Sequence, residues 1–249
     1  MPISRLHAWV TRIALGAAAG HGFALGGGNA LLAHGVISRT TQDVDLFTDQ
    51  QHGVEAAAGA VEAALRDAGF DAERRDQQAG LADVFPGMGE GLAEWVLTAP
   101  DGAQTMLQMA YFDRSRKPVA TDIGVVLDLQ DVVGGKVCAL AGRVEPRDYA
   151  DTAAILERYS PAQLLRFAQR LDRGLQGRDF ADAGNRLDQL PDQLFAAIGI
   201  GPEDVAIIRQ RFTAWPRTAE AANHVLEALE DPLSSSRADV SREDPQAEP

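Results

Sequence analysis

Residues 38–47 read SRTTQDVDLF and place two aspartates two positions apart in a stretch that otherwise favours a β-strand. Val44 and Leu46 support the strand, although strands disfavour aspartate. Residues i and i+2 of a strand point to one face, so Asp43 and Asp45 are expected to project side by side. Because neighbouring carboxylates repel each other, either water screens them or they bind a cation. A lone D-x-D pattern is common by chance, so the surrounding residues must decide.

A glycine turn precedes the aspartates. Residues 23–35 read FALGGGNALLAHG, which predicts a strand, a turn of three glycines and a short helix that Asn29 caps. Glycines at a strand-to-helix turn let backbone N–H groups approach an anion closely, and the helix N-terminus adds its positive end. A flexible tight turn would explain the glycines equally well. Followed after the short helix by the D-x-D pair, they indicate a phosphate loop beside a metal site.

The ligand that suits this pairing is a metal-bound triphosphate. Mg²⁺, or Mn²⁺ in its place, takes hard oxygen ligands, usually one or two carboxylates together with substrate phosphates. Two such ions can clamp the attacking and leaving oxygens of an in-line displacement. We therefore expect Asp43 and Asp45 to bind the metal and the glycine turn to hold the phosphates of an NTP. The residues predicted to bind the nucleotide are Gly27, Gly28, Arg39 and Thr40.

The order of sequence patterns predicts an α+β protein in two parts. Apolar residues at helical spacing indicate a helix over about 54–68, and two apolar runs around APDGA predict a β-hairpin over 93–112. From about 127 to 229 the pattern is helical. We predict an N-terminal α/β domain with a mixed sheet, a helical domain and a polar disordered tail. Their predicted ranges are 1–115, 116–230 and 231–249.

Composition narrows the class of protein. The chain has 249 residues, of which 45% are hydrophobic, and its single cysteine, Cys138, fits a reducing cytoplasm. No stretch approaches the roughly 18 apolar residues of a membrane span. The net charge of −13 argues against a broad basic surface for nucleic acid but allows a local patch. The histidines lack metal-ligand spacing and are expected to serve local structure or lie on the surface: His7, His21, His34, His52 and His224.

Two ordered blocks of the sequence resemble a known family. The first is GGGNALLAHG followed by SRTTQDVDLF, and the second is LQDVVGGKVCALAGRVEPRDYADTAAIL over 129–156. Both are similar to motifs of the nucleotidyltransferase superfamily related to DNA polymerase β, and specifically to its AbiEii/MenT-type toxin branch. In the second motif a helix lysine, Lys136, is followed by Arg147, Asp148 and Asp151. The resemblance implies that the N-terminal domain is a polymerase-β-like nucleotidyltransferase domain.

The resemblance also implies roles for two residues of the second block. Lys136 would stabilise the charge of the triphosphate, and Asp148 would orient or deprotonate the acceptor. Both would be catalytic together with Asp43 and Asp45. From the residues alone, Lys136 could equally be a helix-surface lysine. Asp148 could equally cap the helix that follows, with Asp151 in its first turn.

The function implied is transfer of NMP from an NTP to an acceptor, namely the 3′ end of tRNA, by the toxin of a bacterial toxin–antitoxin system. A cognate antitoxin would be its partner. Two alternatives stay open. The first is the same chemistry on a small molecule such as an aminoglycoside, which the acidic charge favours. The second is a non-catalytic member that binds only nucleotide or a partner protein, against which the intact site residues argue.

Two further expectations concern the surroundings of the D-x-D strand. Polymerase-β-like enzymes usually carry a third carboxylate on a later strand, and the segment TMLQMAYFD offers only Asp113 at its end. Either Asp113 or Asp148 takes that role, or the site has fewer ligands.

Thr41 is expected to share the face of the carboxylates by strand alternation. The resemblance implies that a hydroxyl at this place is phosphorylated by an antitoxin kinase, which would inactivate the toxin.

Overall fold

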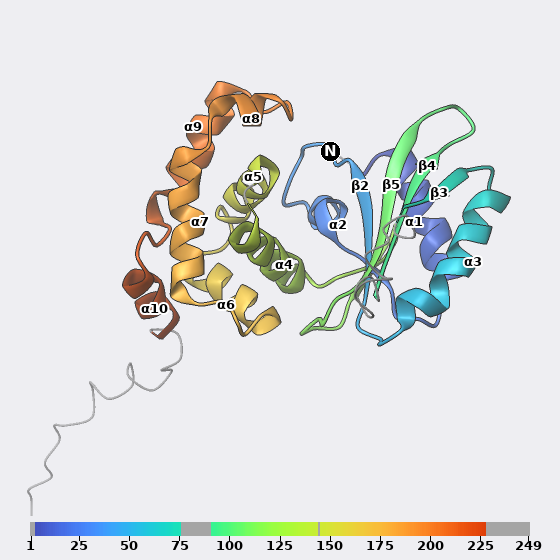
Figure 1. Ribbon diagram of the computed structural model, residues 1–249, viewed down its shortest axis with the longest axis horizontal. Helices are drawn as coiled ribbons and strands as arrows, with labels where there is room; N and C mark the ends of the chain where they lie inside the picture. The colour runs from blue at the N-terminus through green and yellow to red at the C-terminus, as the bar shows by residue number, and fades with distance from the viewer. Residues whose placement is uncertain (1–2, 76–90, 144, 228–249) are drawn as a thin grey trace, which may run out of the picture.

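The computed structural model describes residues 3–75, 91–143 and 145–227. Their arrangement confirms the predicted α+β class, because a mixed sheet with flanking helices forms one half and a helical bundle forms the other (Figure 1). The predicted tail over 231–249 lies outside the described residues. Among those described, no helix has the length and apolar character that a bilayer span needs.

Seven strands form one mixed sheet in the order β3-β4-β5-β2-β1-β7-β6. β2 (Asp43–Thr48) runs parallel to β5 (Gln104–Tyr111) and antiparallel to β1 (Ala24–Leu25). The hairpin predicted over 93–112 is confirmed, because β4 (Leu92–Thr98) pairs antiparallel with β5. The remaining strands are β3 (Asp71–Arg74), β6 (Val119–Thr121) and β7 (Gly124–Val126).

The two faces of the sheet have different environments. In β2 the even-numbered residues are buried, whereas Asp43 and Asp45 keep partial exposure on the opposite face, as strand alternation requires. Helices α1 (Arg5–Ala17) and α3 (Gly53–Asp67) pack on the buried face (Figure 1). The helix predicted over 54–68 is therefore confirmed as α3. The aspartates point away from α1 and α3, toward the helical half of the molecule.

The short helix after β1 differs from the prediction at its start. α2 (Gly27–Ala33) begins within the glycine turn, and its N-cap is Gly26. Asn29 is not the cap, because the turn continues directly into the helix and places Asn29 inside it, fully buried. Its side-chain Nδ2 donates a hydrogen bond to the Asp43 carbonyl at 2.7 Å. The asparagine therefore connects α2 to the D-x-D strand.

The helical half begins with α4 (Leu129–Gly142), which packs against α2 and against α6 (Pro161–Leu171). Prolines stand in the first turn of several helices, where the missing N–H costs no hydrogen bond. Described residues from 129 to 227 are helical apart from the connections, which confirms the predicted pattern. The other elements are α5 (Pro146–Ile155), α7 (Gly177–Gln189), α8 (Asp192–Ala196), α9 (Pro202–Arg211), the 3₁₀ turn η2 (Phe212–Ala214) and α10 (Ala219–Glu227).

The predicted domain boundary at 115 and 116 falls inside the sheet. β6 and β7 extend the sheet to Val126, and α4 begins at Leu129. These strands have three residues each, which is too short for alternation to show in the sequence. The chain therefore leaves the sheet later than its pattern indicates.

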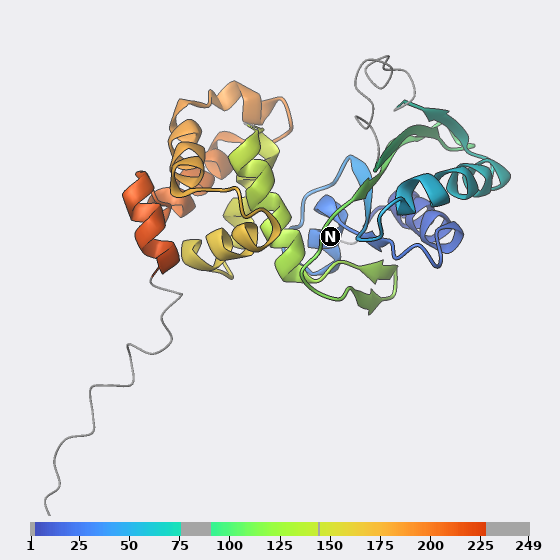
Figure 2. The ribbon, with the colours of Figure 1, turned by 60° about the horizontal axis from the view of Figure 1, so that its bottom comes forward.

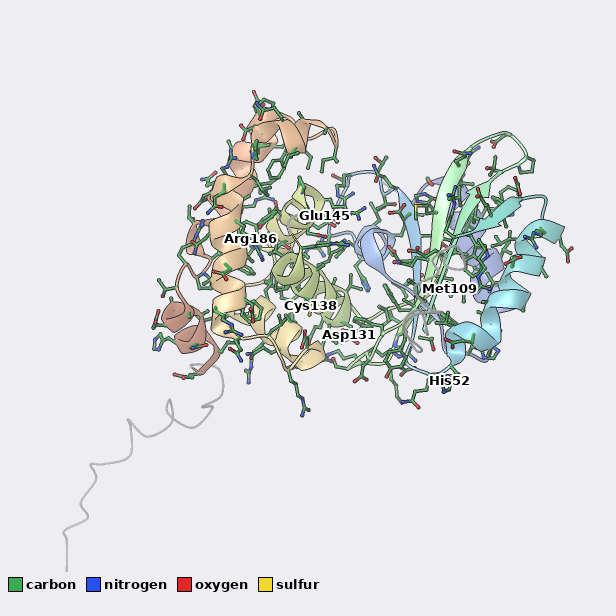
Figure 3. All side chains as sticks on the ribbon, viewed as in Figure 1. His52, Met109, Asp131, Cys138, Glu145 and Arg186 are labelled. Atoms are coloured by element: carbon green, nitrogen blue, oxygen red, sulfur yellow. The ribbon has the colours of Figure 1, made fainter. Side chains whose placement is uncertain are left out.

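Asp131 fixes the passage from the sheet to α4. Its side chain is buried and accepts hydrogen bonds from the backbone N–H groups of Ser115 at 3.2 Å and Arg116 at 2.9 Å. Figure 3 shows Asp131 where α4 meets the strands. A buried carboxylate with these donors ties the start of α4 to the segment after β5. The two lobes visible in Figure 2 are connected at this place.

Candidate active site

A cleft of about 970 Å³ lies between the exposed face of the sheet and the helical half. Strand β2 contributes Asp43 and Asp45, and the helical side contributes Lys136, Arg143 and Arg147. Most of the residues predicted for the site line this cleft, although they come from distant parts of the chain. They are Gly27, Gly28, Arg39, Thr40, Thr41, Asp43, Asp45 and Lys136.

Asp45 lies directly beneath the glycine turn. Gly27 has a φ of +56°, and a Cβ built on it would stand 1.7 Å from Asp45 Oδ2. Both observations require glycine at this position. Burial raises the pKa of Asp45, with Lys136 opposing the increase and Asp43 adding to it. The ionised carboxylate would therefore be stabilised by a cation bound beside it.

Asp43 is more open to solvent than Asp45 and has a basic neighbour. Its side chain is 30% exposed, and Arg147 Nη1 lies 3.5 Å from its Oδ2. No basic residue stands between the two aspartates in the sequence. The fold supplies one from the start of α5, so water alone does not screen the two charges.

Lys136 reaches the cleft from α4. Val133, Val137 and Leu140 on the same helix are fully buried, while the Lys136 side chain is 13% exposed. Its Nζ lies 2.9 Å from Asp151 Oδ2. The lysine is therefore neither a free surface residue nor a core residue, because its ammonium is positioned at the edge of the cleft by a buried carboxylate.

Asp148 and Asp151 lie behind the cations and are fully buried. Arg143 donates to Asp148 through Nε at 2.8 Å and Nη2 at 3.2 Å. The alternative that Asp148 caps α5 is wrong, because Glu145 is the N-cap. The helix begins at Pro146, which places Asp151 beyond the first turn. Asp148 is not among the described residues that line the cleft.

Arg39 connects the two halves of the molecule. It precedes β2 in the chain, and its Nε and Nη2 donate to the two carboxylate oxygens of Asp151, each at 2.8 Å. Its Nη1 donates to the carbonyl of Thr40 at 2.9 Å. Asp151 thus binds Arg39 from one half and Lys136 from the other, and both cations line the cleft.

Thr41 lies before the first residue of β2 and lines the same cleft as Asp43 and Asp45. Strand alternation therefore does not govern its orientation. Its hydroxyl donates to Asn29 Oδ1 at 2.8 Å and lies 3.1 Å from His7 Nδ1. The hydroxyl is therefore engaged in a hydrogen-bond network with Asn29 and His7.

The acidic residue that the sequence analysis missed is Glu94 of β4. Asp113 is exposed after the end of β5 and does not line the described cleft, whereas Glu94 does. Asp45, Gln108 and Glu94 are paired in register across three neighbouring strands, so their side chains share the cleft face. Gln108 Nε2 donates to Glu94 Oε1 at 2.7 Å. The sequence contains a sign of this residue, since the charged Glu94 interrupts an apolar run of the predicted hairpin.

The carboxylates of the cleft fit a metal that is completed by substrate. Among the residues that the structure describes, there is no group of three or more His, Cys, Asp or Glu that could hold a metal ion. Asp43 and Asp45 thus offer two carboxylates. Mg²⁺ commonly uses one or two carboxylates, substrate phosphates and water, so this donor set suits it. The desolvation of Asp45 adds a reason for a cation to bind there.

The fold and the cleft together define a class of protein, the nucleotidyltransferases. The chain belongs to one family within it, the AbiEii nucleotidyl transferase toxins of type IV toxin–antitoxin systems, because the model of that family matches residues 13–214. The recognition made from the two motifs is thereby confirmed, and the protein is an enzyme of the nucleotidyltransferase type.

Solved structures support the same fold. JHP933 from Helicobacter pylori is 16% identical with a TM-score of 0.55, covering 92% of this chain and 100% of its own. MenT4, a nucleotidyltransferase toxin from Mycobacterium tuberculosis H37Rv, is 14% identical with a TM-score of 0.53, covering 89% of this chain and 91% of its own. At these identities the likeness shows the fold alone. No curated protein sequence matches the chain.

Proposed function

We propose that the protein is a metal-dependent enzyme that transfers NMP from an NTP to the 3′ end of tRNA, acting as a toxin in the bacterial cytoplasm. The observation that carries the proposal is the cleft in which Asp43 and Asp45 face Lys136, Arg143 and Arg147. Among the described residues, four cations line this cleft although the chain has a net charge of −13, namely Arg39, Lys136, Arg143 and Arg147. Such a local field attracts a polyphosphate.

The sheet side of the cleft provides the metal and phosphate ligands in this proposal. Asp43 and Asp45 would hold Mg²⁺ or Mn²⁺, which supplies electrostatic stabilisation of the transferring phosphoryl group. Gly27 and Gly28 would offer backbone N–H groups to the phosphates. The close packing of this turn supports the assignment, since a Cβ at Gly28 would stand 2.7 Å from Thr41 Cγ2.

Two cations that Asp151 binds, one from each half of the molecule, would neutralise the triphosphate. Lys136 and Arg39 line the cleft and are bound from behind by Asp151, so both are oriented before a nucleotide arrives. Preorganised cations stabilise developing charge more effectively than mobile ones, because no reorganisation is needed during the reaction. Thr40, exposed beside Arg39, completes the proposed nucleotide site.

In this proposal Asp148 acts on the reaction only indirectly, through the cations that it orients. Its carboxylate is fully buried behind the cleft wall and is bonded by Arg143. A group in this position orients Arg143 and Lys136 and does not reach an acceptor. Glu94, oriented by Gln108 on the cleft face, has the better position to accept the proton of the acceptor hydroxyl. Glu94→Gln, measured beside wild type, tests that role.

Regulation at Thr41 is part of the proposal. Phosphorylation by an antitoxin kinase would add a charge of about −1.5 to −2 beside Asp43. It would also require the hydroxyl to leave Asn29. Such a phosphate would repel the incoming NTP and compete for its metal. Thr41→Glu should abolish transfer and Thr41→Val should preserve most of it, whereas an active Thr41→Glu variant would remove the switch.

One assay tests the function. Purified protein is incubated with Mg²⁺ or Mn²⁺, each labelled NTP and total tRNA, and tRNA length and label are followed on a denaturing gel. We expect 3′ extension with at least one NTP and none after chelation by EDTA. Asp43→Ala serves as the matched inactive control.

The alternative acceptors are tested in a parallel assay. A panel of aminoglycosides is incubated under the same conditions, and the products are separated by chromatography. Label on an aminoglycoside with none on tRNA would select the small-molecule alternative. NTP binding without transfer to either acceptor would overturn the proposed reaction and favour the non-catalytic alternative.

A further inference from the structure

A buried polar cluster lies behind the first residues of β2, where four segments of the sheet half meet. It consists of His7 from α1, Asn29 from α2, Thr41 before β2 and Thr105 from β5, and we call it the His7 cluster. His7 is 5% exposed and is not among the described residues that line the cleft. Its two ring nitrogens reach Thr41 at 3.1 Å and Thr105 at 3.0 Å.

Both ring nitrogens of His7 have polar partners in the cluster. Nδ1 lies 3.3 Å from Asn29 Nδ2 and 3.1 Å from Thr41 Oγ1, and Nε2 lies 3.0 Å from Thr105 Oγ1. Thr105 Oγ1 in turn donates to the Gln42 carbonyl at 3.0 Å. Burial lowers the pKa of His7, although Asn29, Asp43 and Gln42 partly offset this, so the neutral imidazole is favoured.

The cluster ends on the backbone of the D-x-D strand. Asn29 Nδ2 donates to the Asp43 carbonyl at 2.7 Å, and Thr105 holds the carbonyl of Gln42. Two consecutive peptide groups at the start of β2 are therefore fixed by side chains. His7 bonds both of these side chains, so it sits at the centre of the arrangement.

Asp43 needs such support more than Asp45 does. Asp45 lies within β2, paired on one side with Gln108 and covered by Gly27. Asp43 is the first residue of the strand, and its side chain is 30% exposed. A strand end has fewer neighbours that fix it, so its carboxylate position depends on how the preceding turn is anchored.

We propose that His7 is a positioning residue for nucleotidyl transfer. It orients Asn29 and Thr105, which fix the backbone at the start of β2 and thereby place the Asp43 carboxylate beside that of Asp45. The inference rests on the proposed function, in which these two carboxylates hold the metal. A displacement of about 1 Å at a reacting centre can lower the rate by about 100-fold.

The test compares two substitutions of His7. His7→Phe keeps the ring volume but removes both nitrogens, whereas His7→Gln keeps a polar group in the cluster. We expect His7→Phe to lower kcat by about 10- to 100-fold while KM for the NTP changes by less than about threefold. His7→Gln should recover part of the lost rate. Mn²⁺ affinity, measured by electron paramagnetic resonance without nucleotide, should fall in His7→Phe by about tenfold.

Thr11→Val is the matched control for the packing of α1. Thr11 lies one turn further along α1, is fully buried, and its Oγ1 has no hydrogen-bond partner in the structure described. This variant should keep wild-type kcat and Mn²⁺ affinity. Hydrogen exchange adds a local measurement: amides of residues 40–45 should exchange faster in His7→Phe, whereas those of α3 should not change.

The outcomes separate this inference from the function on which it rests. Wild-type kcat and Mn²⁺ affinity in His7→Phe, with an inactive Asp43→Ala, would overturn the positioning role alone. Equal losses in His7→Phe and Thr11→Val would also overturn it, because general packing of α1 would then explain both. Full activity in Asp43→Ala would instead overturn the proposed metal site.

Discussion

Two pairs of aspartates occupy the two halves of the molecule in opposite surroundings. Asp43 and Asp45 on β2 face the cleft, and only Asp43 has an ion-pair partner among the described residues, Arg147 at 3.5 Å. Asp148 and Asp151 on α5 are fully buried, and each is bonded by an arginine at 2.8 Å. The strand pair is left available for a ligand, whereas the helix pair is neutralised inside the protein.

The difference indicates how the protein divides its charges. In the proposed function, the carboxylates that would bind a cation are left poorly compensated, which costs stability in the free protein. The carboxylates of α5 are fully paired, which fixes their cations at the edge of the cleft. The two pairs should therefore respond in opposite ways to substitution.

The largest effect on activity is expected at the strand pair. Asp43→Ala or Asp45→Ala should lower nucleotide transfer by at least about 100-fold, because the metal loses one of its two protein carboxylates. The free energy of unfolding of the metal-free protein should stay the same or increase, since a repulsive pair is relieved. Transfer and a thermal melt are measured on the same sample. Full activity in either variant would overturn the proposed metal site.

The largest effect on stability is expected at the helix pair. Asp151→Ala leaves Arg39 and Lys136 without their shared counter-charge and should lower the free energy of unfolding by roughly 3 kcal/mol. This value is at the lower end of the cost of breaking a buried ion pair, because the Arg39 side chain is 32% exposed. Denaturant unfolding measures the change. Asp179→Ala, at a partly exposed position in α7, is the control and should cost far less.

Lys136 tests whether the oriented cations act on the nucleotide. Lys136→Ala should lower kcat by about 10- to 100-fold, because one charge near the phosphates is lost. Lys136→Arg should not restore the rate fully, since a guanidinium is wider and planar. Arg143 is left unchanged in both variants. Wild-type rates in both would show that Lys136 serves only to neutralise Asp151.

The sequence predicted the elements that depend on local pattern. The D-x-D strand, the glycine turn and the hairpin over 93–112 follow from alternation and turn chemistry, and all three are present. The metal and nucleotide roles assigned to their residues stay predictions. The three-residue strands β6 and β7 were missed because so short a segment carries no periodicity.

What could not be predicted depends on partners far away in the chain. Arg39 and Asp151 are separated by 112 positions, and no local pattern links them. The same holds for Arg147, which approaches Asp43 only after the two halves come together. Nothing in the sequence distinguishes His7 from the other histidines, because its spacing to other residues carries no signal. Its place in a buried cluster follows from the packing of α1 against the sheet.

The smallest predicted effect concerns the pKa of Asp45. Burial raises this pKa in the folded protein, so the folded state retains the Asp45 proton at a pH where the unfolded state has lost it. This group therefore contributes stability at low pH, and that contribution is lost as the pH rises through the folded-state pKa. Asp45→Asn removes the charged form, so above that pKa it should raise the stability of the metal-free protein. Below the ordinary pKa of an aspartate the gain should vanish.

Thermal melts of wild type and Asp45→Asn in EDTA at several pH values measure the difference. An equal gain in stability at every pH would show that the stabilisation does not come from removing the charge. A loss of stability at neutral pH would show that the Asp45 carboxylate is compensated inside the protein, as Asp148 and Asp151 are.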